Sequence, residues 1–304
     1  MGTIKTKKHL GVSIIIPTFN RIEKLKKCIN SIHSQSFNKY EIIIVDNKST
    51  DNTEKYIKKN FKKIKFFSIK NNGSIAKSRN LGIKKSYYDN LAFIDSDDIW
   101  FEKKLELSMK YIYENYDLVY HDMVLQKKNK LFSQKISYTR NLKKNNYEKD
   151  LIFNGPAFAT SSVVLKKKFF FKIKYFNENQ NYIAWEDYDA WIRMSKYFKK
   201  VKRISESLGS VLRDDENYSN DYYLSKNINT FLKKYIKKKR IPNWCLISLI
   251  KINFKKKNYI KVINLSNKIK LNKIDIKLIF IIFLIKMTAL IIIKYKEFTI
   301  FKKK

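Results

Sequence analysis

Three carboxylates, Asp95, Asp97 and Asp98, directly follow a short apolar run at residues 91–94. The run has the pattern of a buried strand, so the acids are expected at a strand end. Like charges crowded at such a place repel one another unless a cation offsets them. A hard divalent ion prefers oxygen ligands and leaves room for waters and substrate phosphates. The stretch therefore predicts either a metal site or a solvated acidic turn that caps a helix.

A second acidic cluster, Glu186 and Asp187, opens a segment with helical spacing. Trp185, Tyr188 and Ile192 would share one face of that helix, with Asp187 to the side. A carboxylate placed in this way can take the proton from a hydroxyl group that attacks a substrate carbon. Acids in a first helical turn also offset the helix dipole, so the cluster alone leaves both interpretations open.

Four apolar runs alternate with helical segments in the N-terminal third of the chain, and a polar residue follows each run. The runs are residues 12–16, 41–45, 64–69 and 91–94, and the polar residues are Thr18, Asp46, Asn71 and Asp95. Near-continuous β-branched runs are typical of parallel strands covered on both faces, joined by right-handed crossovers. Ligands bind outside the carboxyl ends of such strands. Ordinary polar loops would carry Lys and Ser as readily as Asp and Asn.

Local signals place the first two helices and narrow the kind of ligand. Asn20 is expected to cap the helix that starts near Ile22, and Asp51 to open the next one. The six glycines form neither a G-x-G-x-x-G nor a G-x-x-x-x-G-K pattern. A Rossmann-like order without such glycines, but with an Asp-x-Asp, predicts phosphates that are held through a metal ion.

The net charge of +38 would normally favour nucleic acid or an anionic membrane as a partner. Nearly all basic residues are Lys, however, and the seven Arg are scattered, whereas nucleic-acid binding favours Arg and aromatic residues on one patch. We therefore expect mostly solvated Lys with a membrane-facing patch, and no nucleic acid. Two cysteines, three histidines without zinc spacing and no secretory signal fit the cytoplasm.

Four segments stand in the order seen in family 2 glycosyltransferases, at residues 15–21, 45–51, 73–82 and 95–98. The resemblance spans about residues 11–215 and implies an α/β protein with the GT-A fold, a Rossmann-like, mostly parallel sheet flanked by helices. It also implies transfer of a sugar from a nucleotide-diphosphate sugar, with a UDP-sugar as the expected donor. A sugar-phosphate nucleotidyltransferase of related fold would need a Gly-rich basic loop after the first strand, where this chain lacks one.

The resemblance assigns the nucleotide to the ends of the first strands. Pro17, Thr18 and Asn20 would border the base and ribose, and Asp46 or Asn47 would contact uracil. Many members of the family have two acids at that last place. Asn47 keeps an acceptor oxygen there but lacks the charge.

The phosphates and the metal are assigned to the next two segments. Arg79 resembles the basic residue that lies near the base and phosphates. Asp95 resembles the ribose or metal contact, and Asp97 the principal ligand of Mn²⁺ or Mg²⁺. Asp98 would assist in holding the metal or cap the following helix.

The second acidic cluster matches the Glu-Asp pair of the family. Glu186 would bind substrate, and Asp187 would be the general base of an inverting transfer. Asp215 stands where members often carry a His, which removes one possible contact to the diphosphate or the metal.

The composition changes near residue 221, where Lys-rich helical segments begin. We therefore expect a catalytic domain at residues 1–220, with a nucleotide-sugar half (about 11–100) and an acceptor half (about 101–220). Residues 221–304 would form a helical, membrane-associating extension.

The apolar run at residues 278–293 is interrupted by Lys286 and is shorter than the about 20 apolar residues of a membrane span. An interfacial helix flanked by Lys is the favoured interpretation, and a buried cap on the catalytic domain is the alternative. The expected enzyme acts peripherally at the inner face of the cell membrane. Its acceptor would be a glycan or a lipid-linked glycan in the synthesis of cell-surface polysaccharide.

Overall fold

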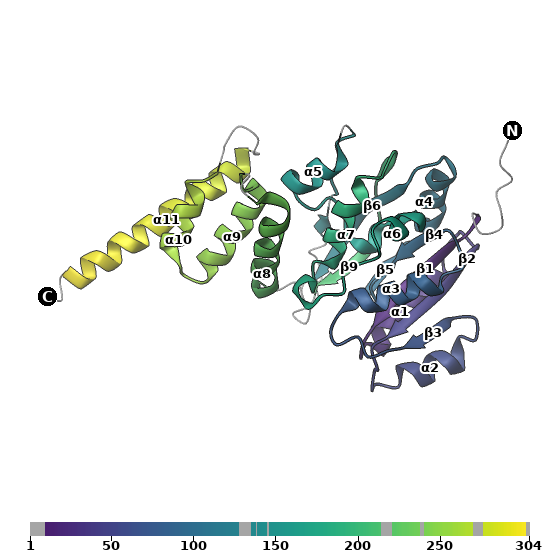
Figure 1. Ribbon diagram of the computed structural model, residues 1–304. Helices are drawn as coiled ribbons and strands as arrows, with labels where there is room; N and C mark the ends of the chain where they lie inside the picture. Colours follow the sequence, from purple (N-terminus) through teal and green to yellow (C-terminus); the bar gives the residue numbers. More distant parts are fainter. Residues whose placement is uncertain are drawn as a thin grey trace. The chain divides into compact units, whose positions relative to one another are not determined.

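The computed structural model describes residues 10–127, 135–137, 139–144, 146–213, 221–237, 240–269 and 276–301. Internal contacts divide the chain into two compact units. Unit 1 comprises Met1–Glu148 and Pro156–Asn217, and unit 2 comprises Lys149–Gly155 and Tyr218–Lys304. Unit 1 holds a β-sheet with helices around it, whereas the C-terminal part of unit 2 is helical (Figure 1). The predicted α/β class with a helical C-terminal region is confirmed.

The N-terminal half of unit 1 has the alternating order that the sequence predicts. Its elements are β1 (Val12–Thr18), α1 (Ile22–His33), β2 (Tyr40–Asp46), α2 (Thr53–Asn60), β3 (Lys65–Ser68), α3 (Ile75–Lys85) and β4 (Asn90–Phe93). The pairings of β1 with β2, β1 with β4 and β2 with β3 are all parallel. The carboxyl ends of these four strands therefore meet at one edge of the sheet.

The second half of unit 1 extends the same sheet. Its elements are β5 (Asp98–Trp100), α4 (Lys104–Tyr113), β6 (Leu118–Lys127), β7 (Lys135–Ser137), α5 (Tyr147–Asn154, which runs into unit 2), η2 (Thr160–Ser162), β8 (Val164–Lys166), α6 (Lys168–Lys172), η3 (Gln180–Tyr182), α7 (Glu186–Ser195) and β9 (Val201–Arg213). The strand order is β3-β2-β1-β4-β8-β6-β9-β5, with β7 beside β6. β8 is antiparallel to β4 and β6, and β5 is antiparallel to β9. The sheet is thus parallel up to β4 and mixed beyond it.

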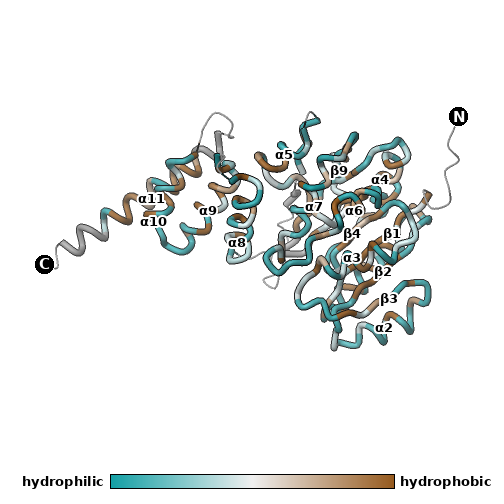
Figure 2. The backbone as a smooth tube through the Cα atoms, viewed as in Figure 1, coloured by the Kyte–Doolittle hydropathy of each residue, from teal (hydrophilic) through white to brown (hydrophobic). Residues whose placement is uncertain are grey.

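Strand β1 is buried on both faces, which explains its near-continuous β-branched run. Val12, Ile14 and Ile16 share one hydrophobic core with residues of α1, α2 and α4. On the other face Ile15 packs against Gly82 of α3, where an added Cβ would lie 2.5 Å from Ile15 Cγ2. Hydrophobic residues accordingly concentrate along the strands of this sheet (Figure 2).

An aromatic cluster fixes α6 and α7 next to the end of β4. Phe93 of β4 contacts Phe170 of α6 and Phe176, each with a centroid distance of 5.6 Å. Phe176 in turn contacts Trp191 of α7 at 6.0 Å. Edge-on aromatic pairs of this kind add to the free energy of folding beyond their buried area. Because these rings pack together, the second acidic cluster is carried by a helix that is anchored on the sheet.

The C-terminal part of unit 2 consists of α8 (Asp221–Phe231), the π-helical turn η4 (Leu232–Ile236), α9 (Asn243–Lys255), α10 (Tyr259–Ser266) and α11 (Ile276–Phe301). Its core is formed by Leu246, Ile250, Val262, Leu265 and Ala289. Helix α11 extends beyond both ends of the apolar run at residues 278–293. No helix in the described part of the chain is both long and apolar enough to cross a membrane.

Candidate active site

The polar residues at the ends of β1 and β2 lie side by side, as the sequence predicts. In the parallel register Pro17 is opposite Val45, and Thr18 is opposite Asp46. The carboxylate of buried Asp46 accepts hydrogen bonds from the backbone N–H of Ser49 at 2.9 Å and from its hydroxyl group. The hydroxyl oxygen of Thr18 is buried and has no hydrogen-bond partner within the described residues. A fixed carboxylate and an unused hydroxyl group therefore meet at this edge.

The expectation that Asn20 caps α1 is wrong. Asn20 has a φ of 48°, and its side-chain oxygen accepts a hydrogen bond from the N–H of Thr50 at 2.7 Å. Its own N–H donates to Ser49 Oγ at 2.8 Å. The first N–H of α1, at Ile22, instead donates to Asp51 Oδ2 at 2.9 Å. Asn20 thus joins the end of β1 to the loop after β2, and Asp51 supplies the cap from that loop.

Asn47 connects the ends of three strands. Its side-chain oxygen accepts a hydrogen bond from the N–H of Asn71 at 2.8 Å, and its own N–H donates to the carbonyl of Thr18 at 2.9 Å. The side-chain amide of Asn71 donates to Ser78 Oγ of α3 at 2.9 Å. The residue therefore contributes to the positions of the loops after β1, β2 and β3.

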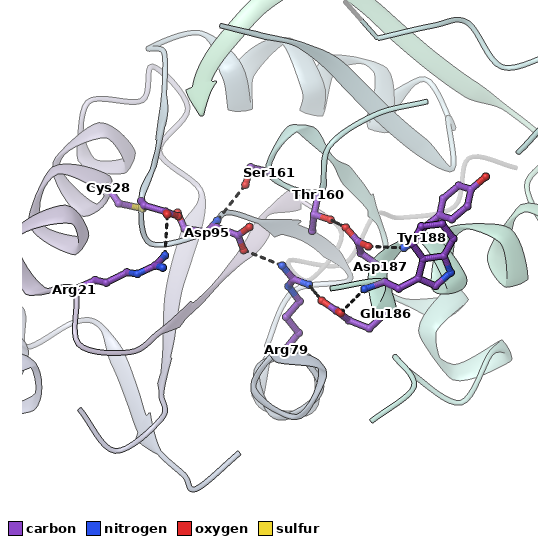
Figure 3. A network of polar contacts seen from close by, with 11 residues as sticks. Arg21, Cys28, Arg79, Asp95, Thr160, Ser161, Glu186, Asp187 and Tyr188 are labelled. Carbon is purple, nitrogen blue, oxygen red and sulfur yellow. Dashed lines mark hydrogen bonds and ion pairs between the residues drawn. The ribbon is translucent and has the colours of Figure 1, made fainter. Parts of the chain in front are cut away.

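Arg79 of α3 forms the centre of the site (Figure 3). Its guanidinium donates to Asp95 Oδ1 at 2.8 Å and to Glu186 Oε1 at 2.7 Å. Burial would lower the pKa of Arg79, but the nearby charges of Asp95, Glu186 and Asp187 outweigh that effect and raise it. One permanently charged side chain therefore holds the first acidic cluster, after β4, to the second, on α7.

The two acids of the second cluster lie in different environments. Glu186 is buried against Arg79, and burial raises its pKa to about 7, although the charge of Arg79 acts in the opposite direction. Asp187 is half-buried, with Oδ2 accepting from the hydroxyl of Thr160 at 2.7 Å and Oδ1 from the N–H of Tyr188 at 2.6 Å. Asp187 is therefore the more accessible of the two carboxylates, and its orientation is fixed.

The short helix η2 contacts both acidic clusters. Its Thr160 donates to Asp187, while Ser161 Oγ accepts from the N–H of Asp95 at 3.1 Å. The indole N–H of Trp100 donates to the carbonyl of Ser161 at 2.7 Å and so fixes η2 against β5. Residues 160–162 are Thr, Ser and Ser, and none of the sequence motifs predicted these two contacts. The structure thus brings together the two acidic clusters that the sequence predicts separately.

The first cluster carries more negative charge than its surroundings offset. Burial and the charge of Asp95 raise the pKa of Asp97. Arg21, which forms an ion pair with Asp97 at 2.8 Å, acts on this pKa in the opposite direction. Burial, with the charges of Asp95 and Asp97, also raises the pKa of Asp98, while a hydrogen bond with Ser161 acts in the opposite direction. A cation bound here would be stabilised by the same charges.

These residues fit a divalent ion that takes some of its ligands from the protein and the others from a substrate. Among the described residues no three or more His, Cys, Asp and Glu side chains surround a common point for a metal. Asp95 and Asp97 are two carboxylates at a strand end, and Mg²⁺ is usually held by one or two carboxylates together with waters and substrate phosphates. The donor set and the excess negative charge agree with that arrangement.

Arg21, Thr160 and Ser161 lie at the site but were not predicted as part of it. Arg21 belongs to the first family-like segment, where it was assigned no contact, and the sequence motifs include neither Thr160 nor Ser161. Asp215, which stands in the place of a family His, lies outside the described residues.

Comparison with known proteins supports the resemblance. A family model described as Glycosyl transferase family 2 matches residues 13–172. An uncharacterized glycosyltransferase of Rickettsia bellii is 44% identical over 106 residues, which are 34% of this chain and 15% of that protein. The poly(ribitol-phosphate) beta-N-acetylglucosaminyltransferase TarP of Staphylococcus aureus is 32% identical over 211 residues, covering 61% of this chain and 63% of TarP. The chain therefore spans less than two thirds of either relative.

Two solved structures share the fold at low sequence identity. S. aureus TarS in complex with UDP-GlcNAc has a TM-score of 0.60 and 17% identity, covering 85% of this chain and 80% of that one. The mannosyltransferase PcManGT of Pyrobaculum calidifontis, in complex with GDP-Man and Mn²⁺, has a TM-score of 0.56 and 13% identity, covering 86% and 74%. This likeness confirms the GT-A fold. The family match extends over more than half of the length of this chain, and the chain therefore belongs to glycosyl transferase family 2.

Proposed function

We propose that the protein transfers a sugar from a UDP-sugar to a hydroxyl group of a glycan or lipid-linked glycan, with inversion at the anomeric carbon. The observation that carries the proposal is the network in which Arg79 and η2 hold Asp95 beside Asp187 (Figure 3). Family membership supports the reaction class. The UDP-GlcNAc bound to TarS and the activity of TarP support a UDP-sugar donor and a surface glycan as the product.

The donor is assigned to the strand ends of the nucleotide half. Pro17, Thr18 and Asn20 would border the base and ribose, with Asp46 and Asn47 at the uracil. The hydrogen bonds from Ser49 fix the carboxylate of Asp46, so its oxygens are oriented before a nucleotide arrives. Such pre-organisation lowers the entropy lost on binding.

The leaving diphosphate is assigned to the first acidic cluster. Mn²⁺ or Mg²⁺, held by Asp95 and Asp97 with Asp98 in support, would act there as a Lewis acid that stabilises the leaving group. Arg79 supplies a fixed positive charge on the same side of the site. Its buried position keeps that charge in a low-dielectric environment, where it acts more strongly than in water.

Asp187 is assigned as the general base that accepts the proton of the attacking hydroxyl. Glu186 is less suited to that role because it is buried and paired with Arg79. Asp187 is more accessible, and Thr160 and the Tyr188 N–H fix its orientation. Glu186 is instead assigned to substrate binding, through its ion pair with Arg79.

A panel of nucleotide sugars tests this assignment. The protein, incubated with UDP-, GDP- and dTDP-sugars, should consume a UDP-sugar and release UDP, and chelation of divalent ions should suppress that release. Consumption of UTP and a sugar phosphate with release of pyrophosphate would favour the nucleotidyltransferase instead. Failure to consume any nucleotide sugar would contradict the proposal.

We further propose that unit 2 binds the anionic inner surface of the cell membrane through α11. Exposed apolar side chains gather on one side of this helix, because successive helical residues are about 100° apart; they are Phe280, Ile281, Phe283, Leu284, Met287, Ile291 and Tyr295. The opposite side, with Ile282, Ile285 and Ala289, faces the core. Helix α11 thus has two apolar faces, and its own unit covers one of them.

Charge complementarity favours an anionic lipid surface as the partner for the exposed face. Residues 221–304 carry 21 Lys and one Arg against three acidic residues. Each Lys near an anionic bilayer adds about 1 kcal/mol of attraction, which salt screens. An apolar helix face with flanking Lys can lie in the headgroup region without spanning the bilayer.

Substitution of Phe283, Met287 and Ile291 together by Ser should abolish sedimentation with phosphatidylglycerol vesicles while the melting temperature is retained. The wild-type protein should sediment with these vesicles, bind phosphatidylcholine weakly and be released by high salt. Phe171→Ser is the matched control, because Phe171 is a 56% exposed aromatic residue of unit 1. Substitutions are preferable to deleting residues 271–304, which would also remove Ala289 from the core. A wild-type protein that ignores vesicles and dimerises through this face would contradict the proposal.

A further inference from the structure

We infer that Arg21 is an internal counter-ion of the donor site, which occupies Asp97 in the ligand-free protein and thereby couples divalent-ion binding to donor binding. The inference rests on the proposed function, since it concerns the regulation of the same site. Its basis is the ion pair between Arg21 Nη1 and Asp97 Oδ2 at 2.8 Å, which joins residues 76 positions apart in the sequence.

The backbone on both sides of Arg21 is fixed by the loop after β2. Asn20 is bonded to Ser49, and the N–H of Ile22 to Asp51. Arg21 itself is the residue that precedes α1 and has non-helical dihedral angles, with φ −142° and ψ 40°. The start of its side chain is therefore held in place beside the turn that carries Asp97, while the long side chain can still change rotamer.

The two acids proposed to hold the metal each have an arginine partner, and the two arginines differ in exposure and in their number of carboxylate partners. Arg79 has a side chain 4% exposed and binds a second carboxylate, Glu186, so its position is fixed. Arg21 has a side chain 25% exposed, and the ion pair described for it is with Asp97. Arg21 can therefore turn to solvent or to another anion once a cation takes its place at Asp97.

A divalent ion at Asp97 would lie close to the guanidinium of Arg21, and the like charges would repel each other. Arg21 should therefore weaken ion binding as long as no nucleotide is bound. A diphosphate brings negative charge to the same place, and guanidinium groups bind phosphate oxygens in a bidentate manner. Arg21 would then exchange Asp97 for the diphosphate, which releases Asp97 to the ion.

This exchange makes the ion and the donor favour each other. By thermodynamic linkage, the factor by which UDP tightens ion binding equals the factor by which the ion tightens UDP binding. The ligand-free protein would hold divalent ions weakly and acquire them together with the donor. Asp97 is thereby neutralised in both states, once by Arg21 and once by the ion.

Binding of Mn²⁺, followed through the electron paramagnetic resonance signal of free Mn²⁺, tests the inference without any turnover. Without UDP, Arg21→Gln should bind Mn²⁺ about tenfold more tightly than the wild type, within the range usual for coupled sites. The tightening of Mn²⁺ binding by UDP should shrink by a similar factor. Arg21→Lys, which keeps the charge, should retain most of the coupling.

Lys27→Gln is the matched control, because it removes the same charge from an exposed position on α1 and should leave both Mn²⁺ constants unchanged. Unchanged or weaker Mn²⁺ binding in Arg21→Gln, or full coupling in that variant, would overturn the inference. A purely structural role would lower the melting temperature without tightening Mn²⁺ binding, and would overturn it as well. Wild-type protein that binds neither Mn²⁺ nor UDP would instead contradict the proposed donor site.

Discussion

Asp187→Asn is expected to lower turnover by roughly 10²–10⁴, the range for loss of a general base. The amide preserves the shape of the side chain and can still accept the hydrogen bond from Thr160, but it cannot take up a proton. Affinity for UDP should remain close to that of the wild type, because the described hydrogen bonds of Asp187 are with Thr160 and Tyr188 and not with the nucleotide half. Steady-state rates of UDP release and calorimetric binding of UDP measure the two effects separately.

Asp189→Asn is the control for this substitution. Asp189 is fully buried and pairs with Arg193 at 2.7 Å, which in turn donates to the carbonyls of Ile173 and Tyr175. Its loss should lower the melting temperature and leave the turnover of folded protein intact. Thr160→Val, which frees Asp187 to rotate, should give an intermediate loss of turnover. An Asp187→Asn variant that turns over like the wild type would mean that another group is the base.

Asp97→Ala is expected to lower donor affinity in the presence of Mn²⁺ by about 100-fold, since metal stabilisation of a diphosphate amounts to several kcal/mol. Chelation of divalent ions in the wild type should reproduce the loss. The fold should tolerate the substitution, because Arg21, the ion-pair partner of Asp97, has a side chain 25% exposed and can turn to solvent.

Measurement of UDP-sugar binding with Mn²⁺ and with excess chelator, for both proteins, tests this prediction. If the wild type binds the donor equally well with Mn²⁺ and with excess chelator, the assignment of the metal is contradicted. An Asp97→Ala variant that still responds fully to Mn²⁺ would show that other carboxylates hold it.

The parallel half of the fold could be predicted because its signals are local. The run at residues 12–16 is mostly β-branched because both faces of β1 are buried. The order of strands and helices and their periodicity are enough to place Thr18, Asp46 and Asp95 at one edge of the sheet. The capping of α1 could not be predicted in this way. Asp51, which caps Ile22, is 29 residues away, and only the folded sheet brings it there.

The site shows the same division. Both acidic clusters could be identified from residue type and spacing, but their connection could not. Arg79 reaches Glu186 across 107 positions, and Thr160 reaches Asp187 across 27. Such pairs are decided by the packing of α3, α7 and η2, which no sequence pattern records. For α11 the sequence suggested an interfacial or a buried helix, and in the structure one face is in the core while the other is exposed.

The anomeric configuration of the first product is the most direct test of inverting transfer with Asp187 as the base. The UDP-α-sugar that is consumed fastest can be followed by proton NMR, with water or an added glycan as the acceptor. With Asp187 as the base of an inverting transfer, the product should appear first in the β configuration, together with UDP. The Asp187→Asn variant should form this product far more slowly. A product that first appears in the α configuration, or formation of the β product at an undiminished rate by Asp187→Asn, would contradict this mechanism.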